Sequence, residues 1–248
     1  YRTGKTPHQL LNDEKRIVSF LAEIYQRVER VYPTDGDLKN IRTLITYIKN
    51  MMLNEDEIEA LDEEAECKIS VIYREYCSKL KELQMIDYDD QMVYAYVMLK
   101  KIPWLLAHFQ ELYPYICVDE AQDTSKIQHA IIALLSARTG NLFMVGDEDQ
   151  SIYGFRAAYP EALLEFEQRH RGAKVLLMEE NFRSDANIVA AADHFIQKNT
   201  LRHEKHMRAS RESVQQIKEI PVGTRKAQYA YLAKVAEGCT TETAVLYR

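Results

Sequence analysis

Two adjacent carboxylates, Asp119 and Glu120, directly follow a short apolar run at residues 115–118. A hydrophobic strand that leads straight into such a pair is the Walker B arrangement. Its first carboxylate is suited to hold Mg²⁺, usually through water, because magnesium keeps much of its hydration. The second can orient and deprotonate the water that attacks a γ-phosphate. A pair that only caps the following helix is an equally good interpretation of so short a motif.

A second polar group follows another apolar run, at residues 142–145. Gly146 and Asp147 come directly after this run, and Gln150 follows three residues later. A glutamine in this position is able to contact a phosphate or the water bound to it. The sequence therefore places a second candidate phosphate-binding group here.

Two aromatic rings and a guanidinium, those of Tyr153, Phe155 and Arg156, come next within four residues. Such rings offer faces on which bases stack, worth roughly 1–3 kcal/mol per base, and the arginine is free for a phosphate or a base. For either ring alone, a place in the protein core is the more economical interpretation.

A third polar group, which contains Phe182 and Arg183, follows an apolar run at residues 175–178. An arginine after a strand is able to neutralise the charge that develops on a transferred γ-phosphate, as arginine fingers do. The alternative is a surface arginine in an ordinary salt bridge.

The three apolar runs predict the element that positions these groups. Each run is too short for a helix, and apolar side chains at every position indicate strands buried on both faces. Such strands, separated by helical segments, are typical of a parallel α/β sheet. Because ligands bind beyond the carboxyl ends of the strands in these sheets, we expect the three polar groups to share one site.

Residues 8–84 have the apolar periodicity of helices. Asn12 or Asp13 is placed to cap the first helix, and a turn is expected at residues 33–37. One long charged helix is expected at residues 55–83, with an acidic first half that suits the helix dipole. We interpret the apolar stripes of all these helices as core packing.

The sequence becomes more polar after Thr200. Two further strands are predicted at residues 214–220 and 243–247, with a helix at residues 224–237 between them.

The composition is that of an ordinary globular protein, with 46% hydrophobic and 28% charged residues. No apolar stretch is long enough for a membrane span or resembles a signal peptide, and the four cysteines lack a paired CxxC spacing. We therefore expect a reduced cytoplasmic protein without structural zinc. The net charge of -6 does not exclude DNA binding, because only the contact groove must be basic. The acidic run at residues 54–66 and the basic run at residues 198–211 are interpreted as solvated faces.

Several of these segments resemble, in order, the motifs of the UvrD/Rep-type superfamily 1 DNA helicases. Residues 119–123 resemble motif II, and residues 146–158 resemble motif III almost residue for residue. Residues 181–184 are similar to motif IV, and residues 86–90 to the acidic-aromatic block that precedes motif II. The similarity is strong over residues 85–199 and weaker elsewhere.

The resemblance implies a role for each matching residue. Phe182 would stack near the adenine, where the family often has tyrosine, and Ala157 stands where the family usually has glycine. That exchange matters if the position requires a positive φ. The other implied roles are Asp119 as the magnesium ligand, Glu120 as the catalytic base, Asp147 as a further nucleotide-binding residue, Gln150 as the γ-phosphate sensor that couples hydrolysis to DNA contacts, Arg183 as the arginine that reaches the γ-phosphate, and Tyr153, Phe155 and Arg156 as contacts to single-stranded DNA.

The resemblance also implies a RecA-like parallel sheet of the P-loop NTPase type, incomplete in this chain, with an all-helical insertion subdomain. The expected domains are the helical insertion at residues 1–84, part of the first motor domain at residues 85–199, and the start of the second motor domain at residues 200–248. The Gly-Lys-Thr at residues 4–6 looks like the end of a phosphate-binding loop, but no strand or glycine precedes it, and we interpret it as a decoy. We therefore expect a fragment that binds nucleotide poorly and does not unwind DNA by itself.

The leading functional hypothesis is a segment of an ATP- and Mg²⁺-dependent DNA helicase or translocase that moves 3′ to 5′ in repair, replication or recombination. Its partners would be single-stranded or partially duplex DNA and the rest of the parent helicase chain, in the cytoplasm at the nucleoid. One alternative is the motor of a recombination helicase–nuclease, and another is a non-catalytic DNA-binding or interaction module. A magnesium nuclease built from Asp87, Asp89 and Asp90 is a more distant hypothesis.

Overall fold

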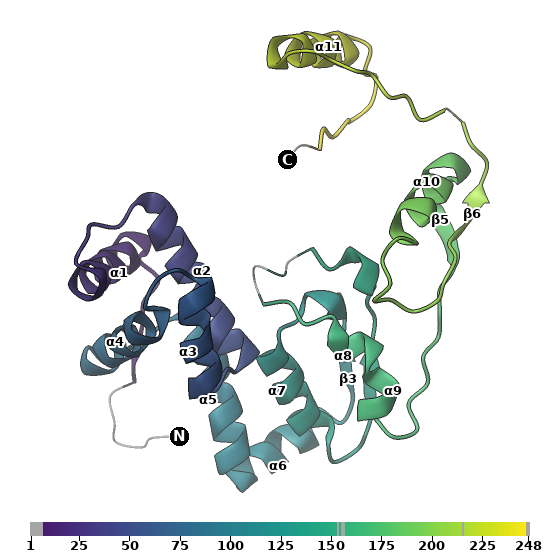
Figure 1. The fold of residues 1–248 in the computed structure, drawn as a ribbon. Helices are drawn as coiled ribbons and strands as arrows, with labels where there is room; N and C mark the ends of the chain where they lie inside the picture. The colour runs from purple at the N-terminus through teal and green to yellow at the C-terminus, as the bar shows by residue number, and fades with distance from the viewer. Residues whose placement is uncertain (1–6, 153, 155–156, 215, 247–248) are drawn as a thin grey trace. The chain divides into compact units, whose positions relative to one another are not determined.

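The N-terminal part of the protein is a group of helices (Figure 1). The structure is a computed structural model, and it describes residues 7–152, 154, 157–214 and 216–246. The first four helices are α1 (Glu14–Glu29), α2 (Asp35–Met51), α3 (Glu55–Glu64) and α4 (Ile69–Glu82).

Side-chain caps set where α1, α2 and α3 begin. Asp13 accepts hydrogen bonds from two N–H groups in the first turn of α1, which confirms one of the two predicted caps. Thr34 and Asn54 form capping boxes at the starts of α2 and α3. The turn predicted at residues 33–37 is shorter than expected, because the cap at Thr34 lets α2 begin at Asp35.

The single helix predicted for residues 55–83 is wrong, because the chain turns between α3 and α4. Glu66, in this turn, has a left-handed backbone with a φ of 52°. The Asp62 carboxylate accepts hydrogen bonds from the N–H and Oγ of Ser70 at 2.8 and 2.7 Å. The turn lets Ile69, which is 0% exposed, and the apolar side of α3 reach one common core.

The apolar stripes of these helices meet in one buried core, as predicted. A short parallel pair of strands, β1 (Gln9–Leu10) and β2 (Met85–Ile86), lies at its edge, and the N–H of Leu11 donates to the carbonyl of Ile86 at 2.8 Å. The largest fully buried apolar side chains of the core are Leu11, Leu21, Ile24, Ile41, Ile48, Ile69 and Ile72.

Helices and short strands alternate in the following segment. The strands β3 and β4 are parallel, with Val118 opposite Met144, which confirms parallel pairing for the first two apolar runs. The elements are α5 (Tyr88–Lys101), α6 (Pro103–Leu112), β3 (Ile116–Val118), the 3-10 turn η1 (Ala121–Asp123), α7 (Lys126–Ser136), β4 (Leu142–Met144), the 3-10 turn η2 (Glu148–Gln150), α8 (Glu161–Leu164) and α9 (Phe166–Arg169).

The prediction that these strands are buried on both faces is wrong. Helix α7 packs against β3. Successive side chains of a strand point to opposite faces, and the central side chains of the two strands reach the surface. Cys117 is exposed, and Phe143 has 62% of its surface exposed.

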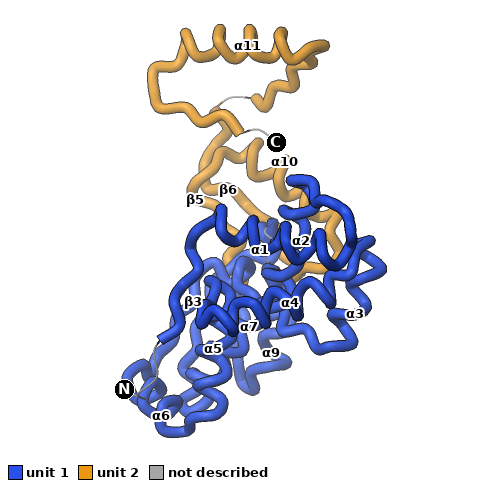
Figure 2. Tube along the Cα trace, turned by 90° about the vertical axis from the view of Figure 1, so that its left-hand side faces the viewer, with its two compact units in different colours: residues 1–176 blue, residues 177–248 orange. Residues whose placement is uncertain are grey.

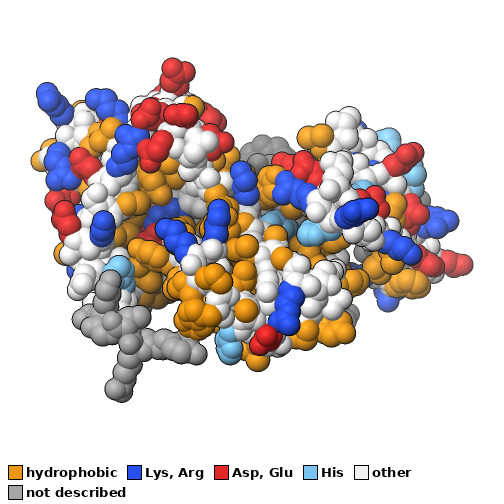
Figure 3. Space-filling view, turned by 90° about the horizontal axis from the view of Figure 1, so that it is seen from below, with side chains coloured by type: hydrophobic (Ala, Val, Ile, Leu, Met, Phe, Trp, Pro, Cys, Tyr) orange, Lys and Arg blue, Asp and Glu red, His pale blue; other side chains and the backbone are white. Residues whose placement is uncertain are grey.

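Large hydrophobic side chains also lie on the surface of α5 and α6, and Figure 3 shows hydrophobic side chains gathered on this face. No helix among the described residues is long and apolar enough to cross a lipid bilayer. The exposed side chains on α5 and α6 are Tyr88, Met92, Tyr94, Met98, Trp104 and Leu112.

The contacts along the chain divide it into two compact units, residues 1–176 and residues 177–248 (Figure 2). The second unit contains β5 (Glu180–Asp185), α10 (Ala186–Ile196), β6 (Arg208–Arg211) and α11 (Arg225–Glu237). Strands β5 and β6 pair in parallel. Thr224 caps α11, which confirms the helix predicted at residues 224–237.

Three predicted strands, at residues 175–178, 214–220 and 243–247, do not form over the part of them that the structure describes. A strand needs a neighbour that satisfies its N–H and C=O groups, and no strand pairs with these segments in the described part of the chain. Leu176 and Met178 are largely exposed to water instead. The third strand begins later, at Glu180.

The α/β class is confirmed, because the described residues combine many helices with small parallel sheets. The sheets are the pairs β1–β2, β3–β4 and β5–β6. The RecA-like sheet, the insertion subdomain and the three-part division of domains stay predictions.

Candidate active site

The first two polar groups of the sequence meet at the carboxyl end of the β3–β4 pair. The N–H of Val145 donates to the carbonyl of Val118 at 2.8 Å, and the N–H of Ala121 donates to the carbonyl of Val145 at 2.9 Å. These bonds continue the parallel ladder beyond the ends of the strands. They place the segment that begins with Asp119 beside the segment that contains Asp147, as predicted for these two groups.

Asp119 and Glu120 are both exposed at this edge. The N–H of Glu120 donates to Asp119 Oδ1 at 2.9 Å, which orients the Asp119 carboxylate. Glu120 has a left-handed backbone with a φ of 48°, a conformation that costs an L-residue roughly 1–2 kcal/mol. Its side chain makes no capping hydrogen bond to η1. The helix-cap interpretation of the pair is therefore not supported.

Gln122 joins the two polar groups, a role that was not predicted from the sequence. Its side chain is 2% exposed. Its Nε2 donates to Glu120 Oε2 at 2.7 Å, and its Oε1 accepts from the N–H of Asp147 at 3.0 Å. The sequence offers one signal for this role: a side chain with both a hydrogen-bond donor and an acceptor lies two positions after the candidate base Glu120.

The Asp147 side chain organises η2. Its Oδ1 accepts from the N–H of Asp149 at 3.2 Å, and its Oδ2 accepts from Nε2 of Gln150 at 2.7 Å. The predicted sensor Gln150 is exposed and is held beside Asp147 by this bond. Glu120, Gln122, Asp147 and Gln150 thus form one continuous series of hydrogen bonds.

The segment after η2 returns to the segment that follows the carboxylate pair. The N–H of Tyr159 donates to the carbonyl of Thr124 at 2.9 Å, and Ser125 forms an isolated antiparallel bridge with Ala158. Ala157 is 1% exposed and has a φ of 60°. The position where the family usually has glycine therefore does have a positive φ in this protein.

The predicted DNA contacts Tyr153, Phe155 and Arg156 lie outside the described residues, and their role stays a prediction. The same is true of the Gly-Lys-Thr at residues 4–6, which we interpreted as a decoy.

His129, a buried residue of α7, contacts the end of η1 through Thr124. Nε2 of His129 lies 2.6 Å from Thr124 Oγ1, which itself donates to the carbonyl of Ala121 at 2.6 Å. Because that hydroxyl proton is already used, the histidine is the donor in the first contact. Burial, and then the positive charge of Arg169, lower the pKa of His129 below its ordinary value.

Phe182 and Arg183 belong to the second unit, and they lie within β5 rather than after a strand as predicted. Asn181 Oδ1 accepts hydrogen bonds from the N–H groups of Arg183 and Ser184 at 2.9 and 2.8 Å. This local turn interrupts the ladder between β5 and β6 after Asn181. Asn181 therefore shapes the backbone that carries both predicted residues, a role that the sequence reasoning missed.

Phe182 has 66% of its surface exposed and lines an open pocket of about 460 Å³. An exposed aromatic face in an open pocket is suited to a planar ligand. The contacts of Phe182 and Arg183 with nucleotide stay predictions. The pocket is lined by Met178, Glu180, Asn181, Phe182, Arg183 and Met207.

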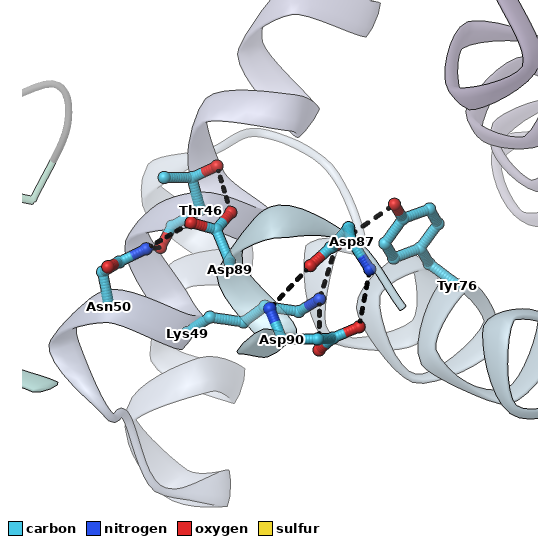
Figure 4. A network of polar contacts seen from close by, with 7 residues as sticks. All are labelled: Thr46, Lys49, Asn50, Tyr76, Asp87, Asp89 and Asp90. Carbon is cyan, nitrogen blue, oxygen red and sulfur yellow. Dashed lines mark hydrogen bonds and ion pairs between the residues drawn. The ribbon is translucent and has the colours of Figure 1, made fainter. Parts of the chain in front are cut away.

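The acidic block at residues 86–90 is tied into the helical core by a lysine (Figure 4). Lys49 Nζ lies 2.6 Å from Asp87 Oδ2 and 2.8 Å from Asp90 Oδ1, and Tyr76 donates to Asp87 at 3.2 Å. These carboxylates are paired inside the protein, so the hypothesis of a magnesium nuclease built from them is not supported.

The third aspartate of the block, Asp89, accepts hydrogen bonds from Thr46 Oγ1 and Asn50 Nδ2 at 2.8 and 2.7 Å (Figure 4). The block therefore connects α2 to the start of α5. Among the described residues, no three or more histidine, cysteine, aspartate or glutamate side chains form a group that could hold a metal ion.

Comparison with known proteins identifies the family of the chain. Residues 2–171 match the model of the UvrD/REP helicase N-terminal domain, a range that includes both polar groups at the β3–β4 edge. The chain belongs to the UvrD/REP helicase family, as the resemblance of its motifs predicted.

Individual relatives agree with this family. The chain is 37% identical to a probable DNA helicase II homolog of Rickettsia felis over 66% of this chain and 25% of that protein. It is 37% identical to the ATP-dependent DNA helicase PcrA of Leuconostoc citreum over 69% of this chain and 23% of that protein. It is 31% identical to DNA helicase II of Haemophilus influenzae over 79% and 26% of the two chains. The chain thus spans about a quarter of the length of these relatives.

Proposed function

We propose that the protein containing this chain is an ATP-dependent DNA helicase or translocase that moves 3′ to 5′ on single-stranded DNA. The observation that carries the proposal is the hydrogen-bonded series from Glu120 to Gln150 at the carboxyl end of a parallel strand pair. It joins a candidate base to a candidate phosphate sensor, in a chain that belongs to a helicase family. The relatives named above as helicases support the same activity.

Glu120 is proposed as the base that orients and deprotonates the attacking water. Its carboxylate is exposed, and only Oε2 is engaged by Gln122 in the described structure, which leaves Oε1 to accept a hydrogen bond from water. The acceptance of one hydrogen bond from an amide fixes the orientation of the carboxylate without removing its charge. General-base catalysis of this kind contributes typically about 10²–10⁴-fold to a rate.

Asp119 is proposed to hold Mg²⁺ together with the phosphates of ATP. The residues present fit this ion, because magnesium is usually bound by one or two carboxylates plus phosphates and waters rather than by a cage of protein ligands. Asp119 is exposed, and the N–H of Glu120 orients its carboxylate. When bound, the ion would neutralise charge on the phosphates during transfer of the γ-phosphoryl group.

The remaining roles follow the family motifs. Gln150 would contact the γ-phosphate, Arg183 would neutralise its developing charge, and Phe182 would stack on the adenine. Tyr153, Phe155 and Arg156 would contact single-stranded DNA. We infer that these parts belong to a RecA-like motor with a helical insertion, completed by the rest of the protein, and that it serves DNA repair, replication or recombination.

The test is ATP hydrolysis by the full-length protein, with and without single-stranded DNA, beside its Glu120→Gln variant. We expect DNA to stimulate turnover in the wild type and the variant to lose roughly 10²-fold or more of the rate, because glutamine cannot accept the proton. Glu63→Gln is the matched control, since Glu63 is an exposed residue of α3. Unwinding of 3′-tailed against 5′-tailed duplexes tests the direction.

Two results would contradict the proposal. Wild-type protein that binds single-stranded DNA without hydrolysing ATP would be a non-catalytic DNA-binding module. Turnover that is equal in the wild type and in Glu120→Gln would remove Glu120 from the mechanism.

A further inference from the structure

We propose that Gln122 is a positioning residue that sets the orientation of the base Glu120 according to the position of the loop at residues 146–151. This inference rests on the proposed function, because it assigns a role in the same ATP-hydrolysing site. It makes Gln122 the connection between the base and the loop that leads toward the predicted DNA contacts.

The geometry defines which end of the Gln122 amide faces which partner. The N–H of Asp147 is a donor, so it must face the carbonyl oxygen Oε1, at 3.0 Å. The amino group Nε2 is then directed to Glu120 Oε2, at 2.7 Å. An ionised carboxylate cannot make both bonds because it has no donor, and an apolar side chain can make neither. The site therefore requires an amide.

The position of the Gln122 side chain is enforced by its surroundings. It is 2% exposed, so water cannot replace a lost partner without a change in structure. On the loop side, a Cβ added to Gly146 would lie 2.9 Å from Gln122 Oε1, 2.9 Å from Leu163 Cδ1 and 3.2 Å from the N of Ala121. The glycine is thus required for the close approach of the loop to the amide.

The series of bonds continues from the loop to the predicted phosphate sensor. The backbone N–H of Asp147 donates to Gln122, and the Asp147 carboxylate accepts from Gln150. A movement of Gln150 toward a γ-phosphate would break its bond to Asp147 Oδ2 and shift the loop whose N–H holds Gln122. The orientation of Glu120 would then change with the state of the loop. This series is a physical connection between two parts of the site, and coupling between them is measurable with paired variants.

The test uses the full-length protein and two substitutions that remove different parts of the bridge. Gln122→Glu keeps an oxygen that accepts from Asp147 but replaces the donor that holds Glu120 by a like charge. Gln122→Met removes both bonds at similar volume. Gln91→Glu and Gln91→Met are the matched controls, because Gln91 is exposed on α5.

Two measurements separate positioning from a structural role. For steady-state ATP hydrolysis with saturating single-stranded DNA, we expect both Gln122 variants to lose about 10- to 100-fold in kcat, the range that misplacement of a catalytic group causes. The KM for ATP should change by less than about 3-fold, because a bond that orients the base acts on the chemical step rather than on the binding of the substrate. For hydrogen–deuterium exchange, the peptide that covers residues 146–151 should exchange faster in Gln122→Met and as in the wild type in Gln122→Glu.

The combined variant Gln122→Glu with Gln150→Ala tests the series directly. If the two residues act in one series, the double variant should be no more impaired in kcat than the worse single variant. Multiplied losses would show two independent roles and would overturn the proposal. Gly146→Ala, which presses on Oε1 from the loop side, should give the same loss of kcat as Gln122→Met.

The failure of this inference differs from the failure of the proposed function. Gln122→Glu with normal loop exchange and wild-type kcat would overturn the inference and leave the helicase assignment intact, provided that Glu120→Gln is inactive. A wild-type protein without DNA-stimulated ATP hydrolysis would overturn both. In that case, a hydrogen–deuterium exchange rate at residues 146–151 that is the same in Gln122→Met as in the wild type would also show that Gln122 does not support the loop.

Discussion

The Lys49 ammonium, on α2, forms a buried ion pair with Asp87, the residue that caps α5, with Nζ 2.6 Å from Oδ2. The lysine side chain is 2% exposed. Burial opposes its charge, but the carboxylates of Asp87 and Asp90 outweigh that effect and raise the pKa of Lys49. Lys49 therefore stays charged inside the protein, and the pair connects the helical core to α5.

Replacement of Lys49 by methionine should destabilise the chain strongly. The variant leaves the buried Asp87 and the partly buried Asp90 without their cation. Removal of one partner of a buried pair typically costs roughly 3–5 kcal/mol. The free energy of unfolding is measured by urea titration with far-UV circular dichroism. Arg74→Met is the control, because its pairs with Glu55 and Glu59 are exposed and worth at most about 1 kcal/mol. Equal losses in the two variants would contradict the assignment.

The position of Lys49 could have been suspected from the sequence, but its partners could not. Lys49 is four residues after Ile45, a member of the predicted apolar stripe, and a lysine on that face calls for a buried counter-charge. Asp87 lies 38 residues away, and the sequence predicts for its carboxylate a place in a family block or, more distantly, in a magnesium site. Spacing along a helix predicts which residues share a face, not which distant segment lies against it.

The strands show the same limit of local pattern. The runs at residues 115–118 and 142–145 pair with each other, and both were predicted. The equally apolar run at residues 175–178 is not a strand, because a strand exists only where a neighbour completes its hydrogen bonds. Gln122 was missed for a related reason: its two partners are two residues before it and 25 residues after it.

Substitution of Ala157 by glycine should change stability little, although it deletes a buried methyl group. Loss of the methyl costs about 0.8 kcal/mol, and the added freedom of the unfolded chain costs about 0.4–1 kcal/mol. Relief of the left-handed backbone at φ 60° returns roughly 1–2 kcal/mol. The expected net change in the free energy of unfolding is therefore within about 1 kcal/mol of zero.

The matched control for this prediction is Ala162→Gly. Ala162 is also buried, but it lies in α8, where glycine brings no relief of backbone strain. Its expected loss is about 1.5–2 kcal/mol, the sum of the methyl and the lower helix propensity. Urea titration of both variants decides the matter, and a larger loss for Ala157→Gly than for Ala162→Gly would argue against strain at Ala157.

The stability of the chain should depend on pH through His129. Its folded pKa lies below the unfolded value of 6.5, so the unfolded chain takes up a proton first as the pH falls. The contribution of neutral His129 is fully present above pH 6.5 and is lost as the pH falls toward the folded pKa. We expect the urea midpoint to fall between pH 7.5 and about pH 5.5, and His129→Gln to reduce that dependence.

The control for the histidine is His108→Gln, because His108 is exposed on α6. This variant should keep the pH dependence of the wild type. His170, which is partly buried near Arg169, also has a lowered pKa, first through burial, and contributes in the same direction. His129→Gln is therefore expected to weaken the pH dependence rather than abolish it, and an unchanged dependence would contradict the role of His129.

Removal of the Phe182 ring should weaken nucleotide binding without loss of stability. The side chain is 66% exposed, so Phe182→Ala leaves no cavity in a core, and the free energy of unfolding should change by less than about 0.5 kcal/mol. If the ring stacks on the adenine as proposed, the KM for ATP of the full-length protein should rise roughly 10-fold, the effect of one lost stacking contact of about 1–1.5 kcal/mol.

Phe182→Tyr keeps the stacking face and should leave KM near the wild-type value. Phe195→Ala, which removes another exposed ring from the same unit on α10, should leave KM unchanged. Equal KM values for Phe182→Ala and Phe195→Ala would exclude Phe182 from the nucleotide site.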